Sequence, residues 1–205
     1  AVVYGLGRTA PEVASDHFHF IQTNVREYDS VQTAFNEIKT NHPDRIDVLI
    51  NNAGLGYFGF IEDHTIERWH EMFETNVNGT FYTAKLAVPI MKAQGSGHIV
   101  NIASTAALEG YPQVSGYCGT KFAVKGISES MYKEMRDYGV KVTCVYPGST
   151  KTDFFKNTSI EPHDYMLMPE DVSNLIIQAL KTPSNAHQVN LEIRPLQPRG
   201  PKKDA

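Results

Sequence analysis

The sequence predicts an α/β fold of three layers, in which helices cover both faces of one doubly wound parallel sheet. Short apolar runs alternate along the chain with longer segments whose apolar residues recur at helical spacing. These short runs are apolar throughout, as in parallel strands that are buried on both faces. No linker or internal repeat divides the 205 residues. We therefore expect a single domain over residues 1–195 and a flexible tail at 196–205, where no apolar period is found.

The N-terminal half supplies three predicted strands and two predicted helices. Apolar runs predict strands at residues 1–6, 17–25 and 47–54. Apolar side chains in residues 28–41 fall at i, i+3, i+4 and i+7, which predicts an amphipathic helix that Asp29 or Ser30 could cap. A longer helix is expected from about Thr65, with a buried stripe that reaches Ala84.

The C-terminal half continues the same alternation. Apolar runs predict strands at residues 98–104, 140–148 and 187–195. Helical periodicity predicts helices at residues 116–139 and 168–183. In an open parallel sheet of this kind, ligands bind beyond the carboxyl ends of the strands, so the residues that follow each strand are the first candidates for a site.

Composition excludes several classes of function. The net charge of −4 gives no basic surface for nucleic acid, and no apolar run approaches the roughly 20 residues that span a bilayer. His17 and His19 would share a strand face but lack a third ligand nearby, so no metal is expected. Cys118 and Cys144 have no metal or redox spacing, which fits a reducing compartment, and we expect a cytoplasmic protein.

Polar residues and glycines follow several predicted strands. They are Asn24 and Val25, then Asn51, Asn52, Ala53 and Gly54, then Ser104, and finally Pro147 and Gly148. The helix at 116–139 starts at the same edge and carries Tyr117 and Lys121 one turn apart, 13 and 17 residues after Ser104. Asn76 falls on the buried stripe of the long helix, where a polar side chain needs a hydrogen-bond partner.

Each of these residues also has an ordinary structural interpretation. Tyr117 and Lys121 could be an exposed pair on a helix, and Ser104 could simply end a strand in a turn. Asn76 could bond to backbone inside the helix, and the NNAG segment could be only a turn. The functional interpretation gains its weight because all of them occur in order along one predicted edge.

The same residues carry a resemblance to a known family. NNAG at 51–54, the first Asn of TNVNG at 75–79, Ser104 with Tyr117 and Lys121, and PGSTKT at 147–152 together resemble the classical short-chain dehydrogenase/reductase family. The likeness runs in order over residues 1 to 195. It implies a Rossmann-type fold, a nicotinamide dinucleotide, and a catalytic tetrad of Ser104, Tyr117, Lys121 and Asn76.

The chemistry of these residue types suits that implied activity. Reducing a carbonyl requires a hydride from the cofactor and a proton for the developing alkoxide. A free tyrosine titrates near ~10, and we expect the Lys121 ammonium to lower the pKa of Tyr117 toward the working range. Ser104 would hold the substrate oxygen, Lys121 would grip the nicotinamide ribose, and Asn76 would fix a water that resupplies protons.

Two features bear on the cofactor. The glycine-rich phosphate loop of the family is absent, and the residues 1–8 align best with its second strand, so we expect that a first βα unit of about 30 residues is missing from the sequence given. Arg8 follows that strand where an acidic residue would bind the ribose hydroxyls of NAD, and this favours NADP over NAD, although Arg8 could be an ordinary loop charge. The expected cofactor-binding residues are Arg8, Asn24, Val25, Asn51, Ala53, Gly54, Tyr117, Lys121, Pro147, Gly148, Thr150 and Thr152.

The sequence thus predicts an oxidoreductase that transfers a hydride between NADP(H) and a small-molecule carbonyl or secondary alcohol. A dinucleotide-sensing or scaffolding protein on the same fold is the alternative, although it would not need the Tyr117 and Lys121 pair. Phe154, Phe155, Tyr165 and Met166 could line an apolar substrate pocket or anchor a loop. The family resemblance implies a homodimer or homotetramer.

Overall fold

The computed structural model describes residues 1–12, 15–43, 45–158 and 160–200. Its strands are β1 (Val3–Gly7), β2 (Phe18–Gln22), β3 (Val48–Asn51), β4 (Gly97–Ile102), β5 (Val140–Pro147) and β6 (Asn190–Ile193). Its longer helices are α1 (Tyr28–Asn41), α2 (Ile66–Phe73), α3 (Gly79–Gln94), α4 (Ser115–Met135) and α5 (Pro169–Leu180). Short 3₁₀ turns lie at Ile61–Asp63, Thr105–Ala107, Arg136–Tyr138 and Asp153–Asn157.

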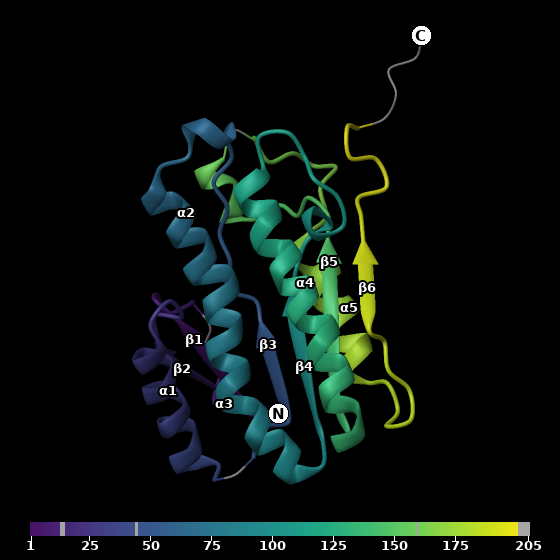
Figure 1. Cartoon of the computed structure of the whole chain (residues 1–205). Helices are drawn as coiled ribbons and strands as arrows, with labels where there is room; N and C mark the ends of the chain where they lie inside the picture. The colour runs from purple at the N-terminus through teal and green to yellow at the C-terminus, as the bar shows by residue number, and fades with distance from the viewer. Residues whose placement is uncertain (13–14, 44, 159, 201–205) are drawn as a thin grey trace.

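The strands form two parallel groups. β3, β4, β5 and β6 pair in that order, and β1 pairs separately with β2. The predicted α/β fold with parallel strands is confirmed, and a gap divides the sheet between β1 and β3 (Figure 1). Part of the predicted tail, residues 196–200, contains no helix or strand, and residues 201–205 lie outside the described part of the chain.

Helices cover both faces of the four-stranded sheet, as Figure 1 shows. On one face Ile99 of β4 and Val142 of β5 pack with Met91 of α3 and Met135 of α4. On the other face the next residue of β4, Val100, packs with Val145 of β5 and Ile176 of α5. Because neighbouring residues of a strand point to opposite faces, burial on both faces requires the uninterrupted apolar runs seen in the sequence.

The long helix predicted from Thr65 is confirmed with one irregularity. Thr65 caps α2 by accepting a hydrogen bond from the backbone N–H of Arg68, as capping threonines do. A π-helical turn at Glu74–Asn78 then joins α2 to α3. Turns of this kind bulge one residue out of the regular ladder and are frequent at functional sites. Here the turn contains Asn76.

A buried polar network ties the sheet to the helices on one face. The Asn51 side chain donates to Asn101 Oδ1 at 2.8 Å and accepts from the Thr83 hydroxyl at 2.6 Å. Asn101 in turn donates to the hydroxyl of Ser128 on α4 at 2.9 Å. These bonds satisfy amide groups that would otherwise be costly to bury, and they fix β3 against β4, α3 and α4.

Candidate active site

Tyr117 and Lys121 point inward from the first turns of α4. Tyr117 is 8% exposed and Lys121 is 4% exposed, so the interpretation as a solvated helix pair is wrong. The Lys121 amine lies 5.6 Å from the centre of the Tyr117 ring and donates a hydrogen bond to the carbonyl of Ile102, the last residue of β4, at 2.8 Å. The helix therefore brings both groups to the carboxyl end of a central strand.

Ser104 lies two residues beyond the end of β4 and caps the short turn that follows. Its hydroxyl oxygen accepts a hydrogen bond from the backbone N–H of Ala106 at 3.1 Å. The same hydroxyl is close enough to Tyr117 to lower the pKa of the phenol. The structure thus brings Ser104 beside Tyr117, and its interpretation as a turn residue holds at the same time.

Asn76 is 1% exposed, and its amide is bonded in three directions. Its Oδ1 accepts from the backbone N–H of Leu55 at 2.9 Å, and its Nδ2 donates to the Leu55 carbonyl and to the Thr120 hydroxyl, each at 2.9 Å. Asn76 therefore pins the segment that follows β3 to α4, one residue away from Lys121. The water expected at Asn76 stays a prediction.

Burial dominates the ionisation of the pair. It raises the pKa of Tyr117, with the Ser104 hydrogen bond acting in the opposite direction, and it lowers the pKa of Lys121 to about 8. The expectation that the pKa of Tyr117 would be lowered is therefore wrong for the protein without its cofactor. The reason is that the free energy lost when the phenolate is removed from water exceeds the stabilisation that the Ser104 hydrogen bond gives it. The Lys121 ammonium does not offset this loss, because it is bonded to the Ile102 carbonyl.

Gly54 marks the place where a ligand could approach the backbone closely. A Cβ atom at Gly54 would lie 3.4 Å from Asn76 Oδ1 and 3.5 Å from Lys121 Nζ, so a side chain would fill the space between these two polar groups. A backbone without a side chain, beside a buried amine and at the carboxyl end of a parallel strand, fits a dinucleotide.

The other expected cofactor residues are spread along the same edge. Val25 and Ala53 line a cavity, and Arg8 is exposed directly after β1. Asn51 also lines this cavity and bonds to Asn101 in the buried polar network, and the Asn24 amide donates to the Glu27 carboxylate at 2.6 Å. Pro147 ends β5, and the N–H of Gly148 bonds to Ile193 at 2.8 Å. Thr150 bonds to the Gly148 carbonyl, and Thr152 caps the turn that begins at Asp153. Their roles toward a cofactor stay predictions.

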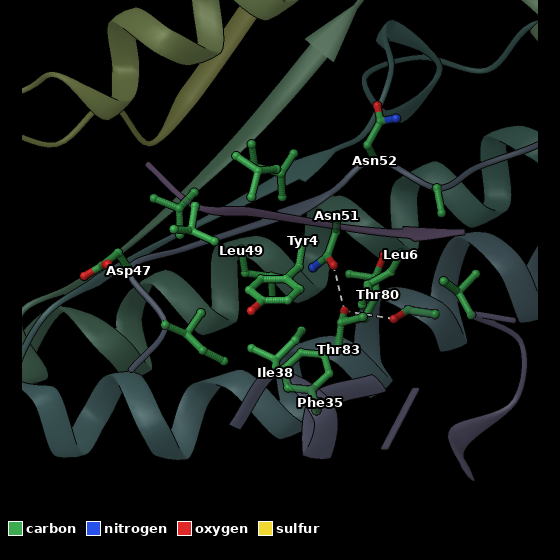
Figure 2. A pocket seen from close by; sticks show the side chains of 18 of the residues that line it. Tyr4, Leu6, Phe35, Ile38, Asp47, Leu49, Asn51, Asn52, Thr80 and Thr83 are labelled. Carbon is green, nitrogen blue, oxygen red and sulfur yellow. Dashed lines mark hydrogen bonds between the residues drawn. The ribbon is translucent and has the colours of Figure 1, made fainter. Parts of the chain in front are cut away.

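The cavity itself occupies the gap between β1 and β3. It measures about 670 Å³ and is lined by Tyr4 and Leu6 of β1 and by Leu49 of β3, with Phe35 and Ile38 of α1 (Figure 2). Neither Tyr117 nor Ser104 lines this cavity. The expectation of a missing first βα unit stays a prediction.

Of the four residues proposed for a substrate pocket, one lies at the site. The Phe154 ring packs 5.2 Å from the Tyr117 ring, centre to centre. Phe155 and Met166 are buried anchors, and Tyr165 is half exposed. Sequence reasoning missed the segment from Leu55 to Phe58, which packs against Tyr117, although its aromatic residues directly after NNAG were a usable signal.

The parallel fold, with the buried Tyr117 and Lys121 beside the partly buried Ser104 at its carboxyl edge, is typical of dinucleotide-dependent oxidoreductases. Comparison with known families agrees, because the model described as short chain dehydrogenase matches residues 6–162. The chain belongs to the short-chain dehydrogenase/reductase family, whose activity is NAD(P)-dependent.

Two curated relatives are uncharacterized oxidoreductases. YusZ of Bacillus subtilis is 35% identical over 159 residues, a match that covers 78% of this chain and 55% of the relative. A protein of Staphylococcus aureus is 32% identical over 192 residues, covering 93% of this chain and 82% of the relative. The chain thus spans little more than half the length of the first relative and most of the second.

Solved structures of similar proteins include bound dinucleotides. Serine dehydrogenase from Escherichia coli superposes with a TM-score of 0.84 at 26% identity, covering 95% of this chain and 86% of that one. An alcohol dehydrogenase from the archaeon Thermococcus sibiricus, complexed with 5-hydroxy-NADP, gives a TM-score of 0.81 at 26% identity. The match covers 91% of this chain and 78% of that one.

The described part of the chain contains neither a membrane-spanning helix nor a metal-binding cluster. Among the described residues, no helix is long and apolar enough to cross a membrane. In the same part of the chain, no group of histidine, cysteine and acidic side chains is arranged to hold a metal ion.

Proposed function

We propose that the protein transfers a hydride between NADP(H) and a small-molecule carbonyl or secondary alcohol, with Tyr117 as the general acid and base. The observation that carries this proposal is the joint burial of Tyr117 and Lys121 beside Ser104 at the carboxyl end of β4. Bound nicotinamide would supply or accept the hydride. The residues of the chain orient the substrate and move the proton.

Ser104, Tyr117 and Lys121 each have one task in carbonyl reduction. The Ser104 hydroxyl donates a hydrogen bond to the substrate oxygen and holds it at the phenol. Tyr117 gives its proton to that oxygen as the hydride reaches the carbon, so the carbonyl becomes an alcohol and the phenol a phenolate. Lys121, whose pKa of about 8 lies near the working pH, then returns a proton to Tyr117. Oxidation of an alcohol runs these steps in reverse.

NADP is favoured over NAD by the position of Arg8. Its guanidinium stands exposed at the carboxyl end of β1, where a 2′-phosphate would lie if the cofactor crosses this edge. The 5-hydroxy-NADP in the archaeal alcohol dehydrogenase supports the same choice.

We also propose a homodimer or homotetramer built through α3 and α4, working in the cytoplasm. Phe81 of α3 is 51% exposed and Phe122 of α4 is 43% exposed, and an interface over these helices would cover both rings. Both cysteines are free and buried, as a reducing compartment allows.

The proposed function is tested by mixing the purified full-length protein with NADPH or NADH and a panel of ketones and aldehydes. We expect loss of NADPH absorbance with at least one carbonyl compound and slower loss with NADH. Turnover with NADH that equals or exceeds turnover with NADPH would overturn the cofactor assignment. Tight binding of NADPH without turnover of any compound in either direction would overturn the activity.

A further inference from the structure

Three aromatic rings meet over the proposed catalytic phenol. The Tyr117 ring lies 6.0 Å from the Phe58 ring and 5.2 Å from the Phe154 ring, and the two phenylalanines lie 6.2 Å apart, all measured between ring centres. The three rings come from distant parts of the chain: the segment after β3, the start of α4, and the 3₁₀ turn at Asp153–Asn157. Separations of 4.5–7 Å are those at which aromatic rings attract one another.

The three rings pack against the backbone of Gly56. A Cβ atom at Gly56 would lie 2.8 Å from Phe154, 3.0 Å from Tyr117 and 3.3 Å from Phe58. All three rings therefore converge on a backbone that has no side chain. Any larger residue at this position would push the three rings apart, so glycine is required for them to lie this close to one another.

The surroundings of the rings are apolar. Tyr117 packs in a cluster with buried Met72 and Ala106, and the partly buried Leu55 and Val114 pack against it. The charges at its border are paired: Glu71 accepts from the Tyr57 hydroxyl at 2.6 Å and pairs with Arg26 at 3.2 Å. Lys121 donates to the Ile102 carbonyl, and Arg68 stacks 5.2 Å from the centre of the Tyr57 ring.

The two phenylalanines are held with unequal firmness. Phe58 stands on a segment that Asn76 pins at Leu55 and that a backbone bond from Gly59 to Gln113, 2.7 Å long, pins on its other side. Phe154 stands in a five-residue 3₁₀ turn that is closed by local bonds, from its own N–H to exposed Thr152 at 3.3 Å and from Thr158 to the Phe155 carbonyl at 2.9 and 3.0 Å. The bonds of the Phe58 segment join distant parts of the chain, so Phe58 is the fixed wall and Phe154 the wall that can move.

We propose that Phe58 and Phe154 form an aromatic clamp that selects carbonyl compounds with a planar aromatic group on the carbonyl carbon, such as aryl ketones. The proposal rests on the proposed function and names its substrate class. The aryl group enters between the two rings as Phe154 moves outward, and its carbonyl oxygen then lies at the Tyr117 phenol and the Ser104 hydroxyl. Short aliphatic ketones have no ring to place between the two phenylalanines and fill the clamp poorly.

The test compares acetophenone with 2-butanone as substrates of the wild type and two variants, Phe58→Ala and Phe154→Ala. The wild type should favour acetophenone in kcat/KM, and each variant should lose about tenfold of that preference, mainly through KM for acetophenone. Phe154→Tyr should keep the preference, because it keeps the ring. Phe60→Ala is the matched control, since this phenylalanine lies two positions from Phe58 but is 53% exposed and outside the cluster. An unchanged preference in both variants that retain turnover would overturn the clamp and leave the proposed function standing.

A binding measurement decides the matter without turnover. Acetophenone is titrated by calorimetry into Tyr117→Phe and into Tyr117→Phe combined with Phe154→Ala, after circular dichroism shows that both are folded. We expect about tenfold weaker binding in the double variant. Equal binding would contradict the clamp, even if the protein reduced no carbonyl compound at all.

Discussion

Burial shifts the pKa values of Lys121 and Tyr117 in opposite directions. Burial disfavours whichever form is charged, so it lowers the pKa of the ammonium group and raises that of the phenol. Both groups are therefore driven toward their neutral forms in the protein without cofactor. In this state Lys121 can exchange a proton near neutral pH. Tyr117 keeps its proton until a bound ligand favours the phenolate.

The buried amine should make stability depend on pH. The pKa of Lys121 is about 8 in the folded protein and 10.5 in its ordinary environment. Between these values the unfolded chain binds more protons, so stability rises with pH across the window, and below pH 8 the full cost of about 3 kcal/mol is present. We expect Lys121→Met to be more stable than the wild type at pH 7, by up to this amount.

Urea unfolding of both proteins from pH 7 to pH 10 measures the difference. The advantage of Lys121→Met should shrink as the pH rises, because the wild type sheds its buried charge. An advantage that stays constant over this range would show that the amine is not destabilised by burial.

Individual elements show what could be predicted from the sequence and what could not. Helix α1 occupies residues 28–41, as its apolar period predicts. The prediction succeeds because a single apolar stripe, which includes Val31 and Phe35, packs against α3. The long helix from Thr65 could be predicted, but its π-helical turn could not, since the apolar stripe runs through it without a break; the turn contains Asn76, which bonds to Leu55 in another part of the chain. Phe154 and Phe155 look alike in the sequence, and only the 3₁₀ turn assigns one to the site and the other to the core.

Two glycines that end helical segments provide a matched pair. Gly95 follows α3 with φ of 68°, and Gly139 follows α4 and its 3₁₀ turn with φ of 71°. A Cβ atom at Gly95 meets nothing within 4 Å, whereas one at Gly139 would meet the Gly95 carbonyl oxygen at 2.4 Å. We expect Gly95→Ala to lose about 1 kcal/mol of unfolding free energy, the cost of the left-handed backbone alone.

Gly139→Ala should lose clearly more, about 3 kcal/mol, because backbone must also move. Urea denaturation at equal m-values compares the two variants. Equal losses would mean that the contact between these two turns relaxes without cost.

At the scale of the whole molecule, the divided sheet is the dominant feature. β4 and β5 have a paired strand on each side, whereas β1 and β3 each have one paired neighbour and face the cavity on the other side (Figure 2). The sequence could predict the alternation of strands and helices. It could not show that β1 and β3 lie on either side of an apolar cavity, since that depends on α1 packing against α3.

Hydrogen exchange should reveal this division. Amides of β4 and β5 should exchange only on global unfolding, while amides of β1 and β3 that face the cavity should exchange at least ~10-fold faster. Exchange measured by NMR on the protein without ligand resolves the strands one by one. Equal protection of β1 and β4 would show that the gap is closed in solution.

The role of Tyr117 is tested most directly by the turnover of Tyr117→Phe at saturating NADPH with the best carbonyl substrate from the panel. Phenylalanine keeps the ring packing against Phe58 and Phe154 but has no proton to give. We expect kcat to fall by at least ~100-fold, within the range of lost general acid catalysis, while the dissociation constant of NADPH changes little. Turnover within a few fold of the wild type would show that another group moves the proton.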